Sequence, residues 1–565
     1  MNNEGEENWL SRYANDFHHW RTDNKDGADV FRRRLGLVET TFYVDGRFFQ
    51  GRADVTALIT VETKTKLSQE NLRHRILLAW TCLRFKHVLL MSHLSGDEDP
   101  YKQEFIIRRP KTTQEALLDA ADSITFVDKL YQVVDVPELW RHCTNIGRIP
   151  NPSKNFSRLL ILPPEKGLNG NTKLRFLQVS GHSITDGLSM NDWVSSFLEL
   201  LNTDQVGLQQ IIGTYCGSNG LRLSLPPAQE DLYTPITGSI ARRRWFWAII
   251  RILRHVRKRL PAAFPNPLYR SERRSESALM NGTYFKLFDY SREKSPPNNA
   301  FIKYFRLSLQ ASQRLQKLAR STGASIGAGC FALVGLAMMA LEEKKNPGVS
   351  LNKRAPFIAS FPLNPRPFFG HKEAPNSCML AFSDGIVLPF LSSDLPIEGR
   401  LKLLSITAHR QLRRFQKRKR GPEVAVQADS PVRMVAQNYV TAVEQIERKL
   451  PPNYRSGVNP QGLYDANLDL GVATCGVSSM GTLKQLSKGK YALDVEDKDF
   501  AADFRDLEMG VRARQNEFLV GSYTESDGVA VFGVSFDGNA IDEKDFNRFE
   551  KIMQRLLETD ERARL

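Results

Sequence analysis

His182, Asp186 and Gly187 form the pattern H-x-x-x-D-G over residues 182–187. An imidazole with a pKa near neutrality is the usual general base for removing a proton from an alcohol or amine. A single histidine near apolar residues is more often a packed or capped core residue, so the alternative to catalysis is purely structural. Asp186 could be a second catalytic carboxylate. We favour a structural role for it, as a helix cap and as the partner of an arginine that fixes the loop.

The elements on either side of this motif favour catalysis. Residues 174–180 mix aromatic, β-branched and alternating polar residues, which is typical of a strand. Apolar residues then recur at helical spacing from Met190 to Leu201. His182 therefore lies where a strand leads into a helix, on rigid support that can present a side chain to a cleft. Gly187 would allow close approach of backbone or a positive φ there.

Two adjacent hydroxyl residues, Ser478 and Ser479, lie in the glycine-flanked segment 476–481. Placed after a strand-like segment, they could donate a hydrogen bond to a developing oxyanion. The alternative is a simple turn, because glycine and serine favour turns for local reasons.

Residues 323–327 match G-x-S-x-G, the nucleophile motif of many hydrolases. That motif must follow a strand, and here an amphipathic helix is predicted before it, so we interpret the match as accidental. The sequence contains no P-loop, no G-x-G-x-x-G and no H-E-x-x-H. Spacing therefore implies no cofactor and no metal.

The composition is that of a soluble globular protein, with 41% hydrophobic and 25% charged residues in 565 residues, a length that predicts several structural units. The six cysteines are far apart and form no C-x-x-C, and the first ten residues lack the features of a secretory signal. We therefore expect a reduced, cytoplasmic protein.

The net charge of +15 is concentrated in one segment. Between Asp231 and Glu272 there are nine Lys or Arg residues and no acidic residue. Within this segment, residues 242–260 predict an amphipathic helix, with Trp245, Ile249, Ile252, Leu253, Val256 and Leu260 on one face and Arg251, Arg254 and Lys258 opposite. Such a helix could lie on an anionic membrane, or pack its apolar stripe against its own domain. No nucleic-acid-binding signature accompanies the charge.

Residues 323–341 carry no charge over 19 positions, close to the length of a membrane-spanning helix. Early glycines and a preceding amphipathic helix favour a loop followed by a buried helix. Elsewhere we predict strand-like structure around a turn over 34–62, a helix over 68–91 with Ser68 as its N-cap, and another helix over 113–131.

Strands and helices alternate in both halves of the chain, which predicts an α/β or α+β fold. The segment 290–300 contains two prolines and two asparagines and is the best boundary. We therefore expect an N-terminal lobe, residues 1–290, with the basic insertion near 240–260, and a C-terminal lobe, residues 300–565. A cleft between two lobes is a common place for a binding site.

The H-x-x-x-D-G motif in a two-lobed α/β chain resembles a superfamily that includes chloramphenicol acetyltransferase, nonribosomal peptide condensation domains and the plant BAHD acyltransferases. Residues 322–325, 360–366 and 477–481 are similar to other parts of it, in the expected order. Residues 33–47 resemble specifically the fungal trichothecene O-acetyltransferases of mycotoxin metabolism. The D-F-G-W-G motif of the plant enzymes is absent.

This resemblance implies two chloramphenicol-acetyltransferase-like lobes with an active-site tunnel between them. It implies an acyl-CoA-dependent O-acyltransferase with His182 as general base, no acyl-enzyme, and acetyl-CoA as cosubstrate. Asp186 and Gly187 would hold the loop, and Ser478 or Ser479 would stabilise the oxyanion. The acceptor would be a hydroxyl of a sesquiterpenoid-like secondary metabolite. Two alternatives stay open: a condensation-type enzyme that uses a carrier-protein thioester, and a non-catalytic binding scaffold.

Overall fold

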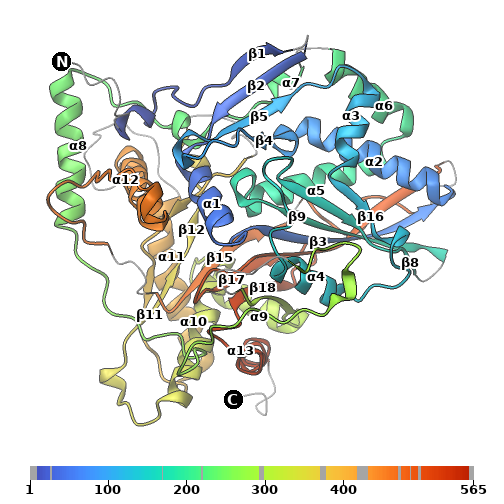
Figure 1. The fold of residues 1–565 in the computed structure, drawn as a ribbon. Helices are drawn as coiled ribbons and strands as arrows, with labels where there is room; N and C mark the ends of the chain where they lie inside the picture. Colours follow the sequence, from blue (N-terminus) through green and yellow to red (C-terminus); the bar gives the residue numbers. More distant parts are fainter. Residues whose placement is uncertain are drawn as a thin grey trace.

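The computed structural model describes residues 9–25, 28–167, 170–217, 220–291, 298–369, 377–416, 430–468, 473–483, 485–493 and 498–558. The predicted α/β class is confirmed: two large mixed sheets lie between layers of helices (Figure 1). The acidic N-terminal residues 1–8 and the two prolines of the predicted boundary lie outside the described residues.

The first large sheet has the strand order β16-β3-β9-β7-β6, with β8 paired to β9. Its strands are β3 (Val55–Thr65), β6 (Ile124–Phe126), β7 (Ser157–Ile161), β8 (Glu165–Lys166), β9 (Thr172–Ser180) and β16 (Phe500–Val511). Its helices are α1 (Leu37–Phe48), α2 (Gln69–Lys86), α3 (Thr113–Ala121), α4 (Val136–Asn145), α5 (Gly187–Asn202), α6 (Gln205–Gly217) and α7 (Gly220–Leu223). In Figure 1, α2, α3 and α6 lie above this sheet.

The second large sheet has the strand order β10-β18-β17-β15-β11-β14. Its strands are β10 (Ala300–Arg306), β11 (Phe357–Ser360), β14 (Ile386–Leu388), β15 (Cys475–Thr482), β17 (Phe518–Thr524) and β18 (Ala530–Asp537). The helices α9 (Leu309–Ser321), α10 (Ile326–Lys345), α11 (Ile397–Gln416) and α13 (Glu543–Arg555) build a second core against it.

Two small sheets complete the fold. One is β1 (Arg21–Lys25), β2 (Ala28–Arg34), β5 (Glu104–Arg108) and β4 (His93–Leu94), and the other is β12 (Pro362–Leu363) with β13 (Ala381–Phe382).

The two halves of the chain are interleaved. β16, from the second half, pairs antiparallel with β3 along its whole length and so becomes the edge of the first sheet. Its residue Gly510 lies so close to β10 that an added Cβ would be 2.6 Å from Ile302. α12 (Pro431–Lys449), also from the second half, packs on α1. Strands and helices of the second half therefore take part in both layers, and the division into lobes at residues 290–300 stays a prediction.

The predicted strand-to-helix transition is confirmed, because β9 ends at Ser180 and α5 begins at Gly187. Ser68 caps α2 as predicted, accepting a hydrogen bond from Asn71 N. The expected strand-like structure over 34–62 is partly wrong, because residues 37–48 form α1. Its first turn is fixed by Glu39, whose carboxylate accepts from Gly36 N at 2.7 Å. The predicted helix over 113–131 ends at Ala121, and β6 follows.

The uncharged segment 323–341 forms the buried part of α10. This is the one helix among the described residues that is long and apolar enough to cross a membrane, and 72% of its apolar window is buried inside the protein. Residues 328–341 are all buried, packed against α9 and α11. The structure thus agrees with the prediction of a buried helix.

The basic segment forms α8 (Ile240–His255), and the face it buries is not the predicted one. Phe246, Trp247, Ile250 and Arg254 are buried, whereas Trp245, Ile252 and Val256 are exposed. The predicted apolar stripe is thus only partly packed on its own domain, because its other members, Ile249, Leu253 and Leu260, are half-buried. A second set of aromatic residues, Trp9, Tyr13 and Tyr439, surrounds Trp247 and provides the inward contact instead.

Candidate active site

His182 lies in the short connection between β9 and α5, at the start of a 3-10 turn (His182–Ile184). Gly181, just before it, donates a backbone hydrogen bond to Phe156 O at 2.8 Å. Ser183, Ile184, Thr185 and Asp186 are buried, while His182 itself keeps partial exposure to solvent. The turn is thus fixed by the surrounding backbone, and His182 is its one residue that is not fully buried.

The ring of Phe42, on α1, stacks on the imidazole of His182. The ring centroids are 3.8 Å apart and the planes differ by 2°. The guanidinium of Arg514 lies 5.7 Å from the centroid of the same phenyl ring. Asp45 holds this arginine in place, with Nη2 2.7 Å from Oδ2, and also binds Lys449 of α12. The orientation of the imidazole is therefore set by α1, and α1 is tied to the second half of the chain.

The two nitrogens of His182 have different surroundings. Nδ1 lies 3.9 Å from the buried thiol of Cys378. Among the described residues, no side chain or backbone group forms a hydrogen bond with Nε2. This nitrogen is consequently available to accept a proton from a bound molecule.

Burial lowers the pKa of His182 below its ordinary value of 6.5. A contact with its own backbone carbonyl and the charges of Asp186 and Asp54 act in the opposite direction, and Arg514 reinforces the lowering. The imidazole is therefore neutral at pH 7, which is the form a general base requires.

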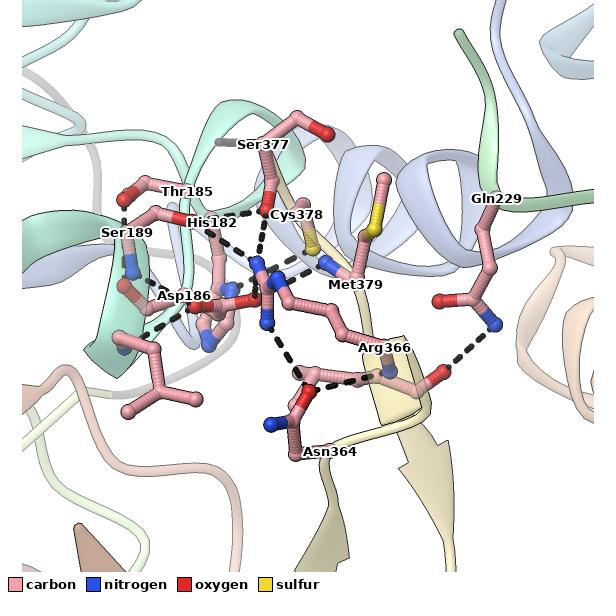
Figure 2. A network of polar contacts seen from close by, with 12 residues as sticks. His182, Thr185, Asp186, Ser189, Gln229, Asn364, Arg366, Ser377, Cys378 and Met379 are labelled. Carbon is pink, nitrogen blue, oxygen red and sulfur yellow. Dashed lines mark hydrogen bonds and ion pairs between the residues drawn. The ribbon is translucent and has the colours of Figure 1, made fainter. Parts of the chain in front are cut away.

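Asp186 uses both carboxylate oxygens for structure (Figure 2). Oδ1 caps α5, accepting from Leu188 N at 3.0 Å and Ser189 N at 2.9 Å. Oδ2 accepts from Arg366 Nη2 at 2.7 Å and from Met379 N at 3.0 Å. With four donors on a buried carboxylate, Asp186 has no lone pair directed at a substrate, so the geometry supports its structural role and not that of a second base.

Arg366 connects the motif to the second half of the chain. Its Nη2 also donates to Ser377 O at 2.7 Å and lies 3.0 Å from Ser189 Oγ. Figure 2 shows the guanidinium at the centre of this network, beside Asp186. Arg366 lies in the segment 360–366 that supported the resemblance.

Gly187 is the first residue of α5 and has a helical backbone, so a positive φ is not what requires glycine here. What its missing side chain allows is the close approach of a neighbouring element. An added Cβ would lie 3.2 Å from Sδ of Met480. Met480 belongs to β15, so Gly187 lets the helix start directly against the second sheet.

Ser478 and Ser479 lie within β15 and not in a turn, so the simple-turn alternative is wrong. Neighbouring strand residues point to opposite faces. Ser479 faces the α10 layer, since its Oγ is 3.1 Å from an ideal Cβ on Gly327. Ser478 shares the opposite face with Met480, which contacts Gly187. The structure thus brings Ser478, and not Ser479, to the side on which the H-x-x-x-D-G motif lies.

The hydrolase-like segment 323–327 has no nucleophile geometry. Ser325 is the N-cap of α10, accepting from Ala328 N at 3.3 Å, and it follows α9 instead of a strand. In the described part of the chain, no group of three or more His, Cys, Asp or Glu residues is placed to hold a metal.

Two surface hollows are lined by residues other than His182. One is lined by Ile146, Leu279, Met280 and Tyr290 among others, and the second by residues of the 108–122 segment. The expected passage between the lobes to His182 stays a prediction.

Sequence reasoning missed Phe42, Cys378 and Arg514. Phe42 could not be identified because its segment predicts a strand, and no sequence pattern indicates that residue 42 contacts residue 182. Cys378 and Arg514 come from loops of the second half, and only the tertiary structure brings them to the motif.

Comparison with solved structures shows the fold this chain shares. It is similar to TRI3, the trichothecene 15-O-acetyltransferase of Fusarium sporotrichioides, with a TM-score of 0.65, 13% identity, and coverage of 96% of this chain and 97% of that one. It is also similar to the first condensation domain of the calcium-dependent antibiotic synthetase, with a TM-score of 0.53, 11% identity, and 93% and 96% coverage. A third similar structure is the condensation domain of the polyketide synthase MokA, with a TM-score of 0.51, 10% identity, and coverage of 93% of this chain and 96% of that one.

No family model matches the sequence, and no curated protein matches it. At identities of 10–13%, the similarity shows that this chain shares its fold with these proteins over nearly its whole length.

Proposed function

We propose that this protein is an acyltransferase in which His182 is the general base for transfer of an acyl group from a thioester to a hydroxyl. The observation that carries the proposal is the imidazole itself: neutral, partly exposed, stacked on Phe42, and with Nε2 unoccupied by protein groups. A shared architecture over nearly the whole of an acetyltransferase supports it.

The reaction needs one proton carrier. Nε2 of His182 takes the proton of the acceptor hydroxyl as its oxygen attacks the thioester carbonyl, and a tetrahedral oxyanion forms. Its collapse breaks the carbon–sulfur bond, and the imidazolium returns the proton to the departing thiolate. The products are an ester and a free thiol. No acyl-enzyme forms, so the step requires no nucleophilic serine or cysteine.

The oxyanion requires a donor that is in place before reaction. Ser478 is the candidate, because it lies on the same face of β15 as Met480, whose side chain packs against Gly187. Ser479 lies on the opposite face of β15, close to Gly327 at the start of α10, so we favour Ser478 for this role. Asp186, held by Arg366, fixes the loop that carries the base.

For the donor and acceptor, we propose acetyl-CoA and a hydroxyl of a sesquiterpenoid-like metabolite. This assignment rests on the sequence resemblance of residues 33–47 and on the similarity to a trichothecene acetyltransferase. The second candidate is a carrier-protein thioester as donor, which the similarity to condensation domains favours. Under either assignment the base and the acyl-transfer step are the same.

The experiment is thiol release by the purified full-length chain, with product identification by mass spectrometry. One arm contains acetyl-CoA and a panel of alcohols that includes sesquiterpenoid alcohols, and the other contains an acetylated pantetheinyl carrier protein. Ester formation in the first arm supports the CoA-dependent assignment, and ester formation in the second arm alone supports the carrier-dependent one. Absence of ester in both, with a correctly folded protein, would contradict acyl transfer.

A further inference from the structure

α8 (Ile240–His255) lies at the edge of the molecule, outside both large sheets (Figure 1). It is anchored from one side only. Arg254 reaches inward and pairs with Glu444 of α12, with Nη1 2.8 Å from Oε1, and also binds Gln461 at 2.7 Å. Phe246, Trp247 and Ile250 are buried beside it. The helix is thus firmly attached by its inner face.

The outer face of α8 is apolar. Trp245 is 64% exposed, Ile252 54% and Val256 63%. Their positions i, i+7 and i+11 place them on one ridge of the helix, opposite the buried face. A tryptophan and two β-branched residues left in solvent on one ridge mark an interaction surface, because monomeric proteins rarely expose such residues contiguously.

A second segment extends this surface. Leu463 is 97% exposed and Tyr464 68% exposed. The Tyr464 ring lies 5.2 Å from the ring of His255, at the end of α8, and Asn467 N donates to Arg254 O at 3.0 Å. Exposed apolar residues from two separate parts of the chain therefore meet at one end of the helix.

The exposed charges on α8 and just beyond its end are cationic. Arg242, Arg243 and Arg244 are exposed in the first turns of α8, and Lys258 and Arg259 are exposed beyond its end. No carboxylate of the described residues is paired with the three consecutive arginines, whereas Arg257, further along, is paired with Asp384 at 2.6 Å. Among the described residues of the neighbouring loop 461–468, Asp465 is an exposed carboxylate, and its backbone carbonyl contacts His255.

We propose that the outer face of α8 docks the protein on an anionic lipid membrane. Trp245, Ile252 and Val256 would enter the interfacial layer, with Tyr464 beside them, and the arginines would meet lipid phosphates. The argument is charge complementarity around an apolar ridge: a helix with an apolar face flanked by Lys and Arg binds in the plane of an anionic interface, where tryptophan is favoured. This inference is independent of the proposed acyl transfer.

The test is co-sedimentation of the full-length protein with vesicles of phosphatidylcholine alone and of phosphatidylcholine with 30% phosphatidylserine, a composition within the range that attracts basic surfaces at about 0.1 M salt. We expect pelleting with the anionic vesicles at least about tenfold stronger than with neutral ones, and weakened at high salt.

Two variants separate the apolar and the electrostatic parts. Trp245→Ser with Ile252→Ser removes the ridge, and Arg242→Gln with Arg243→Gln and Arg244→Gln removes the charge. All five side chains are exposed, so folding is preserved, and each variant should lose most of the pelleting. The matched controls are Leu118→Ser with Val133→Ser, two exposed apolar residues elsewhere, and Lys544→Gln with Arg548→Gln and Lys551→Gln on α13.

Equal pelleting with neutral and anionic vesicles, or unchanged pelleting of the α8 variants, would overturn the proposal. So would light scattering that shows a dimer which the Trp245→Ser, Ile252→Ser variant converts to a monomer, without vesicle binding by the wild type. That result would assign the ridge to a second copy of the chain.

Discussion

Arg366 and Asp186 form an ion pair across the two halves of the chain, with Nη2 2.7 Å from Oδ2. The same nitrogen donates to Ser377 O, while the second oxygen of Asp186 caps α5. This pair therefore fixes the backbone that carries His182 to the second half of the chain. It explains how a histidine and a carboxylate can lie four residues apart while the carboxylate has a structural role.

Arg366→Ala should destabilise the protein by about 3 kcal/mol, because it leaves the carboxylate of Asp186 buried without its ionic partner. It should also lower kcat, since the loop that carries His182 loses its tie to the second half. Urea unfolding and steady-state kinetics measure the two effects. Arg548→Ala, which breaks an exposed pair with Asp545, is the control and should cost less than about 0.5 kcal/mol. Equal losses in the two variants would contradict a special role for Arg366.

The acid limb of the kcat/KM profile should lie below pH 6.5. Burial lowers the pKa of His182, so the neutral, active form persists to a lower pH than for an ordinary histidine. An acid limb at or above pH 6.5 would be inconsistent with His182 as the base.

The same shift affects stability. Below pH 6.5 the unfolded chain binds a proton at His182 that the folded protein does not, so the free energy of unfolding decreases as the pH falls through 6.5 toward the lower folded pKa. His182→Gln should remove this part of the pH dependence, as measured by urea midpoints. His87, whose pKa burial lowers to about 3, acts in the same direction in both proteins and cancels in the difference.

Phe42→Leu should lower kcat about tenfold with little change in KM, because an imidazole without its stacking partner loses the orientation that proton transfer requires. The stability cost should be about 2 kcal/mol, because leucine has three fewer side-chain carbons and leaves a small cavity. Phe85→Leu, which removes a stacked aromatic pair with Tyr215 far from the motif, should cost similar stability and leave kcat unchanged. A normal rate in Phe42→Leu would show that the stack is structural only.

Ser478→Ala should lower kcat by about a hundredfold, the effect of removing one donor to an oxyanion. Ser479→Ala should have a small effect, because its hydroxyl contacts the start of α10 at Gly327. The pair differs by one position on one strand, so single-turnover rates of the two variants compare the two faces of β15 directly. A larger loss in Ser479→Ala would reverse the assignment.

The support of His182 could be predicted from the sequence because its signals are local. β9 alternates along its length, and α5 shows helical periodicity from Met190 to Leu201 behind an Asp186 cap. The role of Asp186 followed from the same logic, since a carboxylate at the first turn of a helix has donors within reach. The sequence could predict that an arginine pairs with Asp186, but it could not identify Arg366 as that arginine.

The failures have tertiary causes. Residues 37–48 are rich in threonine, valine and aromatic residues, which favour strands, yet they form α1 because burial on all sides and the Glu39 cap outweigh propensity. The predicted helix over the basic segment is confirmed as α8, but the residues it buries most deeply are not those of the predicted apolar face. Its segment carries apolar residues on two faces, and only the partner helix α12 and its Glu444 decide which one is buried.

The most direct test of the central claim is the rate of ester formation by His182→Ala, measured by thiol release and mass spectrometry beside wild type with the donor and acceptor that support turnover. We predict a loss of at least about a hundredfold, the contribution of a positioned general base, in a protein whose circular dichroism and urea unfolding show that it remains folded. A folded His182→Ala protein that forms ester at close to the wild-type rate would contradict the account.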